Sequence, residues 1–484
     1  MPVPRSTMAT VGDGAPPRAA SSGNGDNMNL VLAFIFGYIA LQLGFAWWAS
    51  RRVHNEVDYL LAGRQLGPWF GVFTVFATWF GAETCIGAAG RAHTDGVSGV
   101  QTDPFGYALG IVIVGLVFAI PLWKRGIVTL ADLFRSRFGP GVERWAAILM
   151  IPTSLLWAAA QIRAFGQVLA ASSELGVGLA ITLAAAVVIL YTTTGGMWAD
   201  AMSDLVQGSV LIVGVVTVGV LVWLNGGQAQ MAALPMETLR FVDPEVSWLA
   251  TLEALAVPIC GSIAAQELVA RVLAIRSPQL ARRATVGAGM LYLLVGLVPV
   301  SVGLIGVHYV GALDEPEQVL MRVAQTQLPT VLYAVFVGAL VSAILSTVDS
   351  ALLVSGSLAA RNLVLPLRPG LSDAARLRVN RIAVALFGLV AYGLALAGES
   401  VYDLVVTASS LGTAGLLVMM LAALWAPRVG QAASAYAAMA AGVVTYVGAA
   451  YVGAADFPYL LSLAAAVVAY GLFIPIGRPL ASIR

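Results

Sequence analysis

Charged residues are scarce in this chain, since only 11% of its 484 residues are Asp, Glu, Lys or Arg, whereas 59% are hydrophobic. The 26 Lys and Arg exceed the 25 acids by one, so there is no basic stripe of the kind that nucleic-acid binding requires. The two cysteines, Cys85 and Cys260, lie in apolar segments, which argues against a disulfide framework and a thiolate metal site. The three histidines form no ligand cluster. These shortages exclude a nucleic-acid-binding protein and a metalloenzyme.

Long apolar runs fill the sequence instead, each long enough to cross about 30 Å of hydrocarbon as a helix. The sequence therefore predicts an all-α polytopic membrane protein. We expect about thirteen transmembrane helices, at 29–50, 66–90, 104–123, 144–170, 174–194, 199–225, 247–272, 284–311, 329–364, 380–398, 402–426, 431–453 and 457–477.

The two ends of the chain are expected to lie on opposite sides of a cell (inner) membrane. Twenty of the 26 Lys and Arg, Arg271 among them, fall in loops on one side, which the positive-inside rule assigns to the cytoplasm together with the C-terminus. Residues 1–27, rich in Gly, Ser, Pro and Ala, are expected to be a disordered N-terminus outside the cell, and residues 28–484 to form a single membrane domain.

Helix-breaking residues recur at matching places. Gly81 interrupts the second span, and Pro258 and Gly261 interrupt the seventh, five spans later. Paired interruptions are typical of inverted repeats whose broken helices line a site at the membrane midplane. We therefore expect two inverted five-helix repeats, at about 66–225 and 247–426, with extra helices at 29–50, 431–453 and 457–477.

A cluster of oxygen-bearing side chains occupies the ninth span. Ser342, Ser346, Asp349 and Ser350 share one helical face, and Thr347 lies beside it. Hydrocarbon penalises unpaired hydroxyls and carboxylates, and a hard cation prefers oxygen ligands, so this cluster indicates a bound cation. The alternative is that these small polar residues join helices by close packing and hydrogen bonds.

Other polar groups lie near the breaks. Asp204 follows Asp200 by one turn and is deeper in the sixth span, whereas Asp200 suits the membrane interface. Arg163, in the fourth span, requires either an acid of the protein, Glu83 or Glu267, or an anionic group of a solute. Trp79 could hold a cation against its ring. The residues expected to bind a solute are Trp79, Glu83, Gln161, Arg163, Gln266 and Glu267.

Three motifs carry a family resemblance. The segments Asp58–Pro68, Tyr191–Gln207 and Ala343–Ser350 resemble, in this order, those of the sodium:solute symporters. The resemblance implies the fold of the leucine transporter. It also implies a main sodium site formed by the backbone carbonyls of Ala77, Phe80 and Ala343 and the hydroxyls of Ser346 and Thr347.

A second ion position follows from the same resemblance. Asp204 and Ser350 match the acid and the hydroxyl that hold a second sodium in some members, but Asp349 stands where those members carry a hydroxyl. Asp349 could strengthen a second sodium, replace it with a proton or serve structure alone.

The solute expected from the resemblance is a carboxylate or a zwitterionic amino acid. The segments Ala77–Gly81 and Asp103–Tyr107 are similar to choline transporters, but Ala265 stands where their cation cage has a tryptophan, and Arg163 where they have a small polar residue. Sialic acid members use an arginine on the corresponding helix to bind the substrate carboxylate. Arg163 is therefore expected to do the same.

The sequence thus predicts a transporter and not an enzyme, because it offers no nucleophile or metal set for catalysis. The function expected is sodium-coupled symport that imports a small polar solute by alternating access, with sodium as the coupling ion and no cofactor. The partners expected are the solute, sodium and the lipid bilayer, with no obligate protein partner. The alternatives are a proton-coupled carrier that uses Asp204 and Asp349, and a membrane solute sensor.

Overall fold

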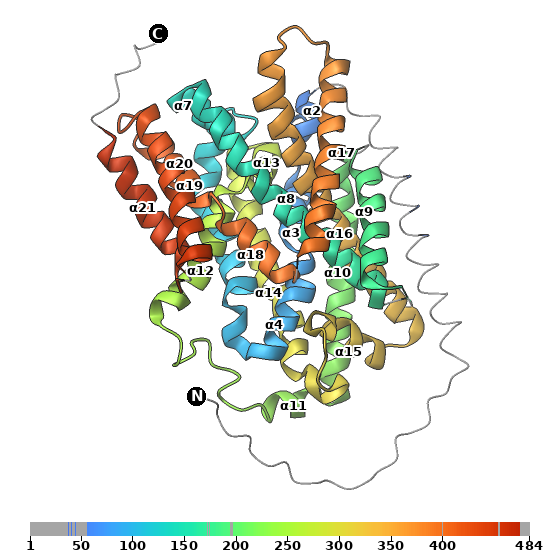
Figure 1. Cartoon of the computed structure of the whole chain (residues 1–484). Helices are drawn as coiled ribbons and strands as arrows, with labels where there is room; N and C mark the ends of the chain where they lie inside the picture. Colours follow the sequence, from blue (N-terminus) through green and yellow to red (C-terminus); the bar gives the residue numbers. More distant parts are fainter. Residues whose placement is uncertain are drawn as a thin grey trace.

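The computed structural model describes residues 56–171, 173, 175–193, 197–398, 400–453 and 455–474, together with Gly37, Ala40 and Gly44. The expected N-terminal segment 1–27 and nearly all of the first span, 29–50, lie outside the described residues. All regular elements of the described part are helices (Figure 1), and its one bridge-type backbone pairing joins Leu66 and Ile275. The expectation of an all-α chain is confirmed.

The first repeat begins with a broken span. Helix α3 ends at Trp79, and the span continues after a break as η2 and α4, because Phe80 and Gly81 leave the helical path. The helices of this half are α3 (Pro68–Trp79), η2 (Glu83–Gly87), α4 (Ala88–Asp95), α5 (Tyr107–Ile113), η5 (Val114–Phe118), α6 (Ala119–Lys124), α7 (Leu130–Phe138), α8 (Pro140–Ala171), α9 (Val177–Thr192) and α10 (Met197–Val222).

The second repeat contains two bent spans. The axes of α12 and α13 meet at 48°, and those of α18 and α19 at 42°. The helices of this half are α12 (Trp248–Ala264), α13 (Gln266–Ala274), α14 (Pro278–Val310), α15 (Val319–Gln327), α16 (Thr330–Ser357), η8 (Leu358–Val364), α17 (Asp373–Ala397), α18 (Val401–Ser410) and α19 (Thr413–Trp425). Two further helices follow, α20 (Ala432–Val447) and α21 (Pro458–Leu472).

Short elements connect these helices. They are α2 (Glu56–Leu61), η1 (Ala62–Arg64), η3 (Gly96–Val100), η4 (Gln101–Gly106), η6 (Trp223–Gly227), α11 (Gln228–Ala232), η7 (Pro316–Gln318), η9 (Leu365–Leu367) and η10 (Gly448–Val452).

The break in the seventh span differs from the predicted position. Pro258 and Gly261 both lie inside α12, and the chain turns at Ala265, whose backbone is extended (φ −73°, ψ 122°). Membrane helices tolerate proline and glycine where neighbouring helices pack closely. Both residues serve such packing here, since the Pro258 ring presses on Gly106 and the Gly261 backbone on Ser409. The break is therefore present, but four residues after Gly261.

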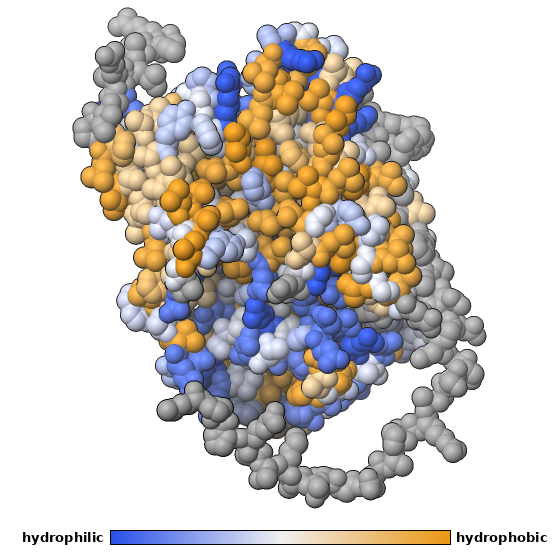
Figure 2. Space-filling model, in the orientation of Figure 1, coloured by the Kyte–Doolittle hydropathy of each residue, from blue (hydrophilic) through white to orange (hydrophobic). Residues whose placement is uncertain are grey.

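The surface has the polarity of a protein that crosses a membrane. Seven described helices are long and apolar enough to span a bilayer, or nine if each bent pair is counted as one span. Large apolar side chains such as Val213 on α10, Leu294 on α14 and Leu389 on α17 are exposed, whereas α16 is enclosed by other helices. Figure 2 shows the resulting apolar belt, with hydrophilic residues gathered at the end that carries α11 and α15 in Figure 1.

A pair of backbone hydrogen bonds ties the approach to α3 to the exit from α13. The Leu66 amide donates to the Ala274 carbonyl (3.1 Å), and the Arg276 amide donates to the Leu66 carbonyl (3.1 Å). The two spans that are broken near the middle of the protein are thereby joined at one end.

Candidate functional site

The break in the second span frees backbone carbonyls of α3. The Phe80 amide still donates to Phe76 (2.7 Å), but the Gly81 amide turns back to the Trp79 carbonyl (3.1 Å) and to Glu83 Oε1 (3.3 Å). In an intact helix the Gly81 amide would donate to the Ala77 carbonyl. The Ala77 carbonyl must therefore find partners outside its own helix.

Hydroxyls of α16 supply those partners. Ser346 Oγ lies 3.3 Å from the Ala77 carbonyl oxygen and 2.9 Å from that of Ala343. Thr347 Oγ1 lies 3.0 Å and 3.1 Å from the same two oxygens. Four uncharged oxygens from two helices thus converge in a buried place, which is the donor set that a hard cation prefers. The carbonyl of Phe80, the fifth residue predicted for this site, belongs to the same break.

Gly81 lies between this oxygen cluster and two polar side chains. A Cβ at this position would lie 2.9 Å from Thr347 Oγ1, 2.8 Å from Gln161 Oε1 and 2.8 Å from Glu83 Oε2. Gln161 donates to Glu83 Oε2 (2.6 Å) and accepts from the Ala82 amide (3.0 Å). The break, the oxygen cluster and the Glu83 carboxylate therefore form one site.

A second buried carboxylate lies nearby. Asp103 accepts hydrogen bonds from Thr84 Oγ1 and from the Tyr292 hydroxyl, both at 3.0 Å, and these two hydroxyls are 2.6 Å apart. Tyr292 packs edge-on against Phe80 at 5.3 Å. The sequence contains Asp103 within a motif but gives no hint that Tyr292, in a distant span, is its partner.

Three aromatic residues form a wall beside the break. The rings of Trp79 and Trp157 are 5.2 Å apart, and Tyr107 meets Trp157 edge-on at 5.9 Å. Trp79 Nε1 donates to Ser262 on α12 (3.2 Å), and the Tyr107 hydroxyl lies 2.7 Å from that of Ser409 on α18. The three rings are almost fully buried. Trp157 was not predicted, although it precedes Gln161 by one helical turn.

The remaining residues predicted for solute binding have other neighbours. Gln266 accepts from the Leu130 amide at the start of α7, and Glu267 accepts from Ser154 on α8. Arg163 donates to the Ala395 carbonyl on α17 (3.5 Å), and its charge acts on Glu317 in η7. Of the six residues predicted, Trp79, Glu83 and Gln161 are therefore gathered at the break, whereas Arg163, Gln266 and Glu267 are hydrogen-bonded to Ala395, Leu130 and Ser154.

The residues predicted for a second ion divide between two sets of contacts. Asp204 accepts from Thr74 on α3 (2.6 Å), while the Ser350 hydroxyl bonds to Asp200 (3.2 Å). Both oxygens of the buried Asp349 carboxylate lack a hydrogen-bond partner among the described residues. The second position therefore stays a prediction.

The expectation that Arg271 lies in a loop is wrong. Arg271 lies in α13, is 1% exposed and forms an ion pair with Asp200, which is also 1% exposed. Arg271 also donates to Thr78 Oγ1 (2.8 Å), to the Ser350 hydroxyl and to Met197 Sδ. The signal that could have identified this pair is a lone arginine near the end of the broken seventh span and an acid near the start of the unbroken sixth span.

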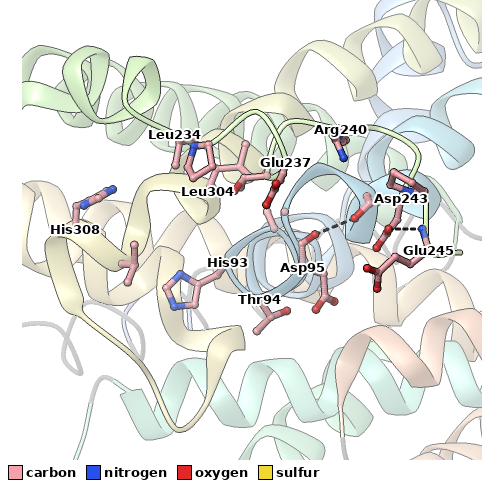
Figure 3. A pocket seen from close by; sticks show the side chains of 17 residues that line it. His93, Thr94, Asp95, Leu234, Glu237, Arg240, Asp243, Glu245, Leu304 and His308 are labelled. Atoms are coloured by element: carbon pink, nitrogen blue, oxygen red, sulfur yellow. Dashed lines mark hydrogen bonds between the residues drawn. The ribbon is translucent and has the colours of Figure 1, made fainter. Parts of the chain in front are cut away.

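A polar pocket of about 760 Å³ opens at the end of the molecule that carries α11. Figure 3 shows that its labelled side chains come from α4, from the loop before α12 and from the end of α14, with His93, Asp95, Glu237 and His308 among them. Asp95 is paired with Arg91 (3.4 Å), which also contacts Asp403 on α18 (2.8 Å). The pocket is open to solvent, whereas the three rings of the aromatic wall are buried from solvent.

Comparison with known proteins gives a consistent result. Residues 59–444 match the model of the Sodium:solute symporter family. The chain is 29% identical over 394 residues to High-affinity choline transporter 1 of Drosophila melanogaster, an alignment that covers 78% of this chain and 63% of that protein. It is 23% identical over 351 residues to the Sodium/proline symporter of Staphylococcus aureus, covering 69% of this chain and 68% of that protein.

Among solved structures, a Na+-coupled sialic acid symporter in its substrate-bound outward-open state is similar, with a TM-score of 0.81 and 18% identity over 93% of this chain and 98% of that one. This likeness confirms the expected leucine-transporter fold. Members of the Sodium:solute symporter family are transporters and not enzymes. The chain belongs to the sodium:solute symporter family, and it is a multi-pass membrane transporter.

Proposed function

We propose that the protein is a sodium-coupled symporter that imports a small organic solute by alternating access. The observation that carries this proposal is the convergence of Ala77 and Ala343 carbonyls with Ser346 and Thr347 hydroxyls at the break in α3. Sodium held by both α3 and α16 would favour the state in which these helices are together. Inward movement of one positive charge through 100 mV releases about 2.3 kcal/mol, which supplies the driving force for uptake.

The solute that the site supports best is a small organic cation such as choline. Glu83 and Asp103 are both buried, and the described residues that donate hydrogen bonds to them are all uncharged. The main sodium ligands are uncharged as well. A buried carboxylate either takes up a proton or is compensated by positive charge, and an aromatic wall attracts cations to its faces. The names of the choline transporters to which the chain is similar support the same class.

A zwitterionic amino acid is the second candidate. The carboxylate expected in the solute depended on Arg163, which donates to the Ala395 carbonyl on α17 and acts electrostatically on Glu317 in η7. The similarity to a sodium/proline symporter supports an amino acid. The ammonium group of such a solute would still use the aromatic wall.

Uptake into proteoliposomes distinguishes these proposals. Purified protein is reconstituted, and tritiated choline and proline are supplied under an inward sodium gradient, an inward proton gradient or neither. We expect sodium-dependent choline uptake. Uptake driven by protons alone would contradict sodium coupling, proline uptake without choline uptake would favour the second candidate, and no transport of either would favour a sensor.

A matched pair of variants tests the aromatic wall. Trp157→Leu removes a buried ring from the wall, and Trp145→Leu removes a ring that is 55% exposed on the same helix. Loss of a cation–π contact of about 2 kcal/mol should weaken choline affinity about 30-fold in the first variant. The second should retain it. Equal effects in the two variants would contradict the assignment of the wall to the solute.

We place the end that carries α11 and α15 outside the cell and the end that carries α7 in the cytoplasm. The arginine-rich loops support this placement. It makes the polar pocket of Figure 3 part of the outer face. Labelling of single cysteines introduced at Glu237 and Arg378 with a membrane-impermeant maleimide on intact cells tests it, since only the Glu237 position should react.

A further inference from the structure

We propose that Arg271 is a tethered cation that fills the second cation position, so that the protein binds one exchangeable sodium ion per chain. This inference depends on the proposed sodium coupling and specifies the number of ions coupled to it. It rests on where the guanidinium lies and on which oxygens it engages.

The guanidinium occupies the centre of a buried polar cluster formed by four helices. Arg271 reaches out of α13 to Thr78 on α3, to Asp200 on α10 and to Ser350 on α16. All four side chains are at most 3% exposed. An arginine in such a place cannot be neutralised by deprotonation, so its positive charge is permanent.

One of the oxygens that Arg271 engages, the Ser350 hydroxyl, is an oxygen that a second sodium would need. Ser350, the hydroxyl predicted for that ion, accepts from the guanidinium and bonds to Asp200 and to the Ser346 carbonyl (3.0 Å). A sodium ion at Ser350 would have to displace the guanidinium, because two cations cannot share one hydroxyl oxygen without strong repulsion. The tethered charge therefore competes with a second sodium in every molecule.

The surrounding acids explain why a cation is needed at this place. Asp200, Asp204 and Asp349 are all buried and close enough to interact electrostatically. One oxygen of Asp204 and both oxygens of Asp349 lack a hydrogen-bond partner among the described residues. If Arg271 were removed, Ser350 and these carboxylate oxygens would be available to an ion from solution.

The tethered cation is also connected to the main sodium site. Thr78, which accepts from Arg271, directly follows Ala77, and Ser350 donates to the carbonyl of Ser346 one turn along α16. Both helices thus contribute residues to the sodium site and one further residue, Thr78 or Ser350, to the guanidinium. Arg271 thereby links α3 and α16 through Thr78 and Ser350, next to the residues predicted for sodium.

Direct counting of bound sodium tests the inference without knowledge of the solute. Purified full-length protein is titrated with 22Na+ in a scintillation proximity assay, and the saturating amount of sodium is divided by the amount of protein. We expect one sodium per chain for the wild type and for Arg271→Lys, and a second, saturable sodium for Arg271→Ala. The control is Arg276→Ala, which removes an exposed arginine five residues later and should leave the count at one.

The outcomes separate this inference from the proposed function. Two sodium ions on the wild-type chain would overturn the inference and leave sodium coupling intact, and this measurement does not depend on whether Arg271→Ala folds. A well-folded Arg271→Ala variant that still binds one sodium would also overturn it. Absence of saturable sodium binding by the wild type would overturn the proposed function, and the inference with it.

Discussion

Removal of the two α16 hydroxyls tests the main sodium site most directly. In the variant Ser346→Ala with Thr347→Val, the shape of each side chain is nearly kept, but the site loses two of the four oxygens that converge between α3 and α16. The carbonyls of Ala77 and Ala343 remain, without the ligands that complete the shell. A lost hydrogen-bonding or ligand group in a buried site costs about 1–3 kcal/mol.

With about 1.5 kcal/mol for each hydroxyl, the loss is about 3 kcal/mol, which corresponds to about a 150-fold weaker affinity for sodium. The measurement is a 22Na+ saturation curve on purified protein, followed by the sodium concentration that gives half-maximal choline uptake in proteoliposomes. Each hydroxyl also hydrogen-bonds across the α3–α16 contact, so the folded state of the variant is checked by its elution volume and thermal unfolding.

Ser355→Ala provides the matched control. Ser355 is buried in the same helix, and its hydroxyl bonds to the Leu352 carbonyl of its own helix (3.0 Å). This substitution should leave sodium affinity unchanged. If the double variant folds and its half-saturating sodium concentration stays within threefold of the wild type, the assignment of these oxygens to sodium is refuted.

Two other substitutions have definite expected outcomes. Gly81→Ala places a methyl group less than 3 Å from Thr347 Oγ1 and should weaken sodium binding at least tenfold in a 22Na+ saturation curve. The control is Gly287→Ala, whose new methyl group would meet a single atom at 3.7 Å and should leave sodium affinity unchanged. Equal sodium affinities of the two variants would contradict the close approach at Gly81. Glu317 accepts from the Val401 and Tyr402 amides at the start of α18, so Glu317→Ala should lower the unfolding temperature and Glu317→Gln should not. Burial raises the pKa of Glu317 above its usual range, so the protonated form is favoured in the folded state, and the stabilising effect of its proton is lost as pH rises through the raised pKa. The Gln variant should therefore match the wild type below about pH 4.5 and exceed it at higher pH, as measured by thermal unfolding; a difference that shrinks with pH would contradict this.

Much of the architecture could be predicted from the sequence because a bilayer restricts it so strongly. Hydrocarbon requires every backbone group to be satisfied within a helix, so apolar runs are enough to predict the long apolar helices of the described residues. The shorter helices α7 and α15 lie between the predicted spans and were not predicted. The same restriction makes exceptions informative. Ser346 and Thr347 stand out in an apolar run, Gly81 breaks one, and the structure brings these three positions together.

The exact place of a break depends on neighbouring helices and was predicted less well. Pro258 is the residue that local rules favour for a break, yet α12 continues through it and turns at Ala265. The bend between α18 and α19, at Gly412 with its φ of 76°, was missed altogether. A local sequence does not show which side chains of other spans will fill the space beside a proline or a glycine.

Charged partners were the least predictable part of the site. Arg271 and Asp200 are 71 residues apart, and each alone is compatible with a membrane interface. Arg163 posed the opposite problem, since its position on α8 indicated solute binding but its side chain extends to the Ala395 carbonyl. The direction of a long side chain is decided by tertiary contacts, which periodicity does not encode.

The backbone pairing at Leu66 gives the two broken spans a common anchor. The Leu66 backbone is hydrogen-bonded to both Ala274 and Arg276. A tilt of α3 would therefore be transmitted to the end of α13 through these backbone hydrogen bonds, without the need for side-chain contacts. Arg271 lies three residues before that anchor and donates to Thr78 on α3, so we expect the guanidinium to move together with α3. Movement of α3 on binding an ion would therefore also displace α13, and the first helices of the two inverted repeats would move together.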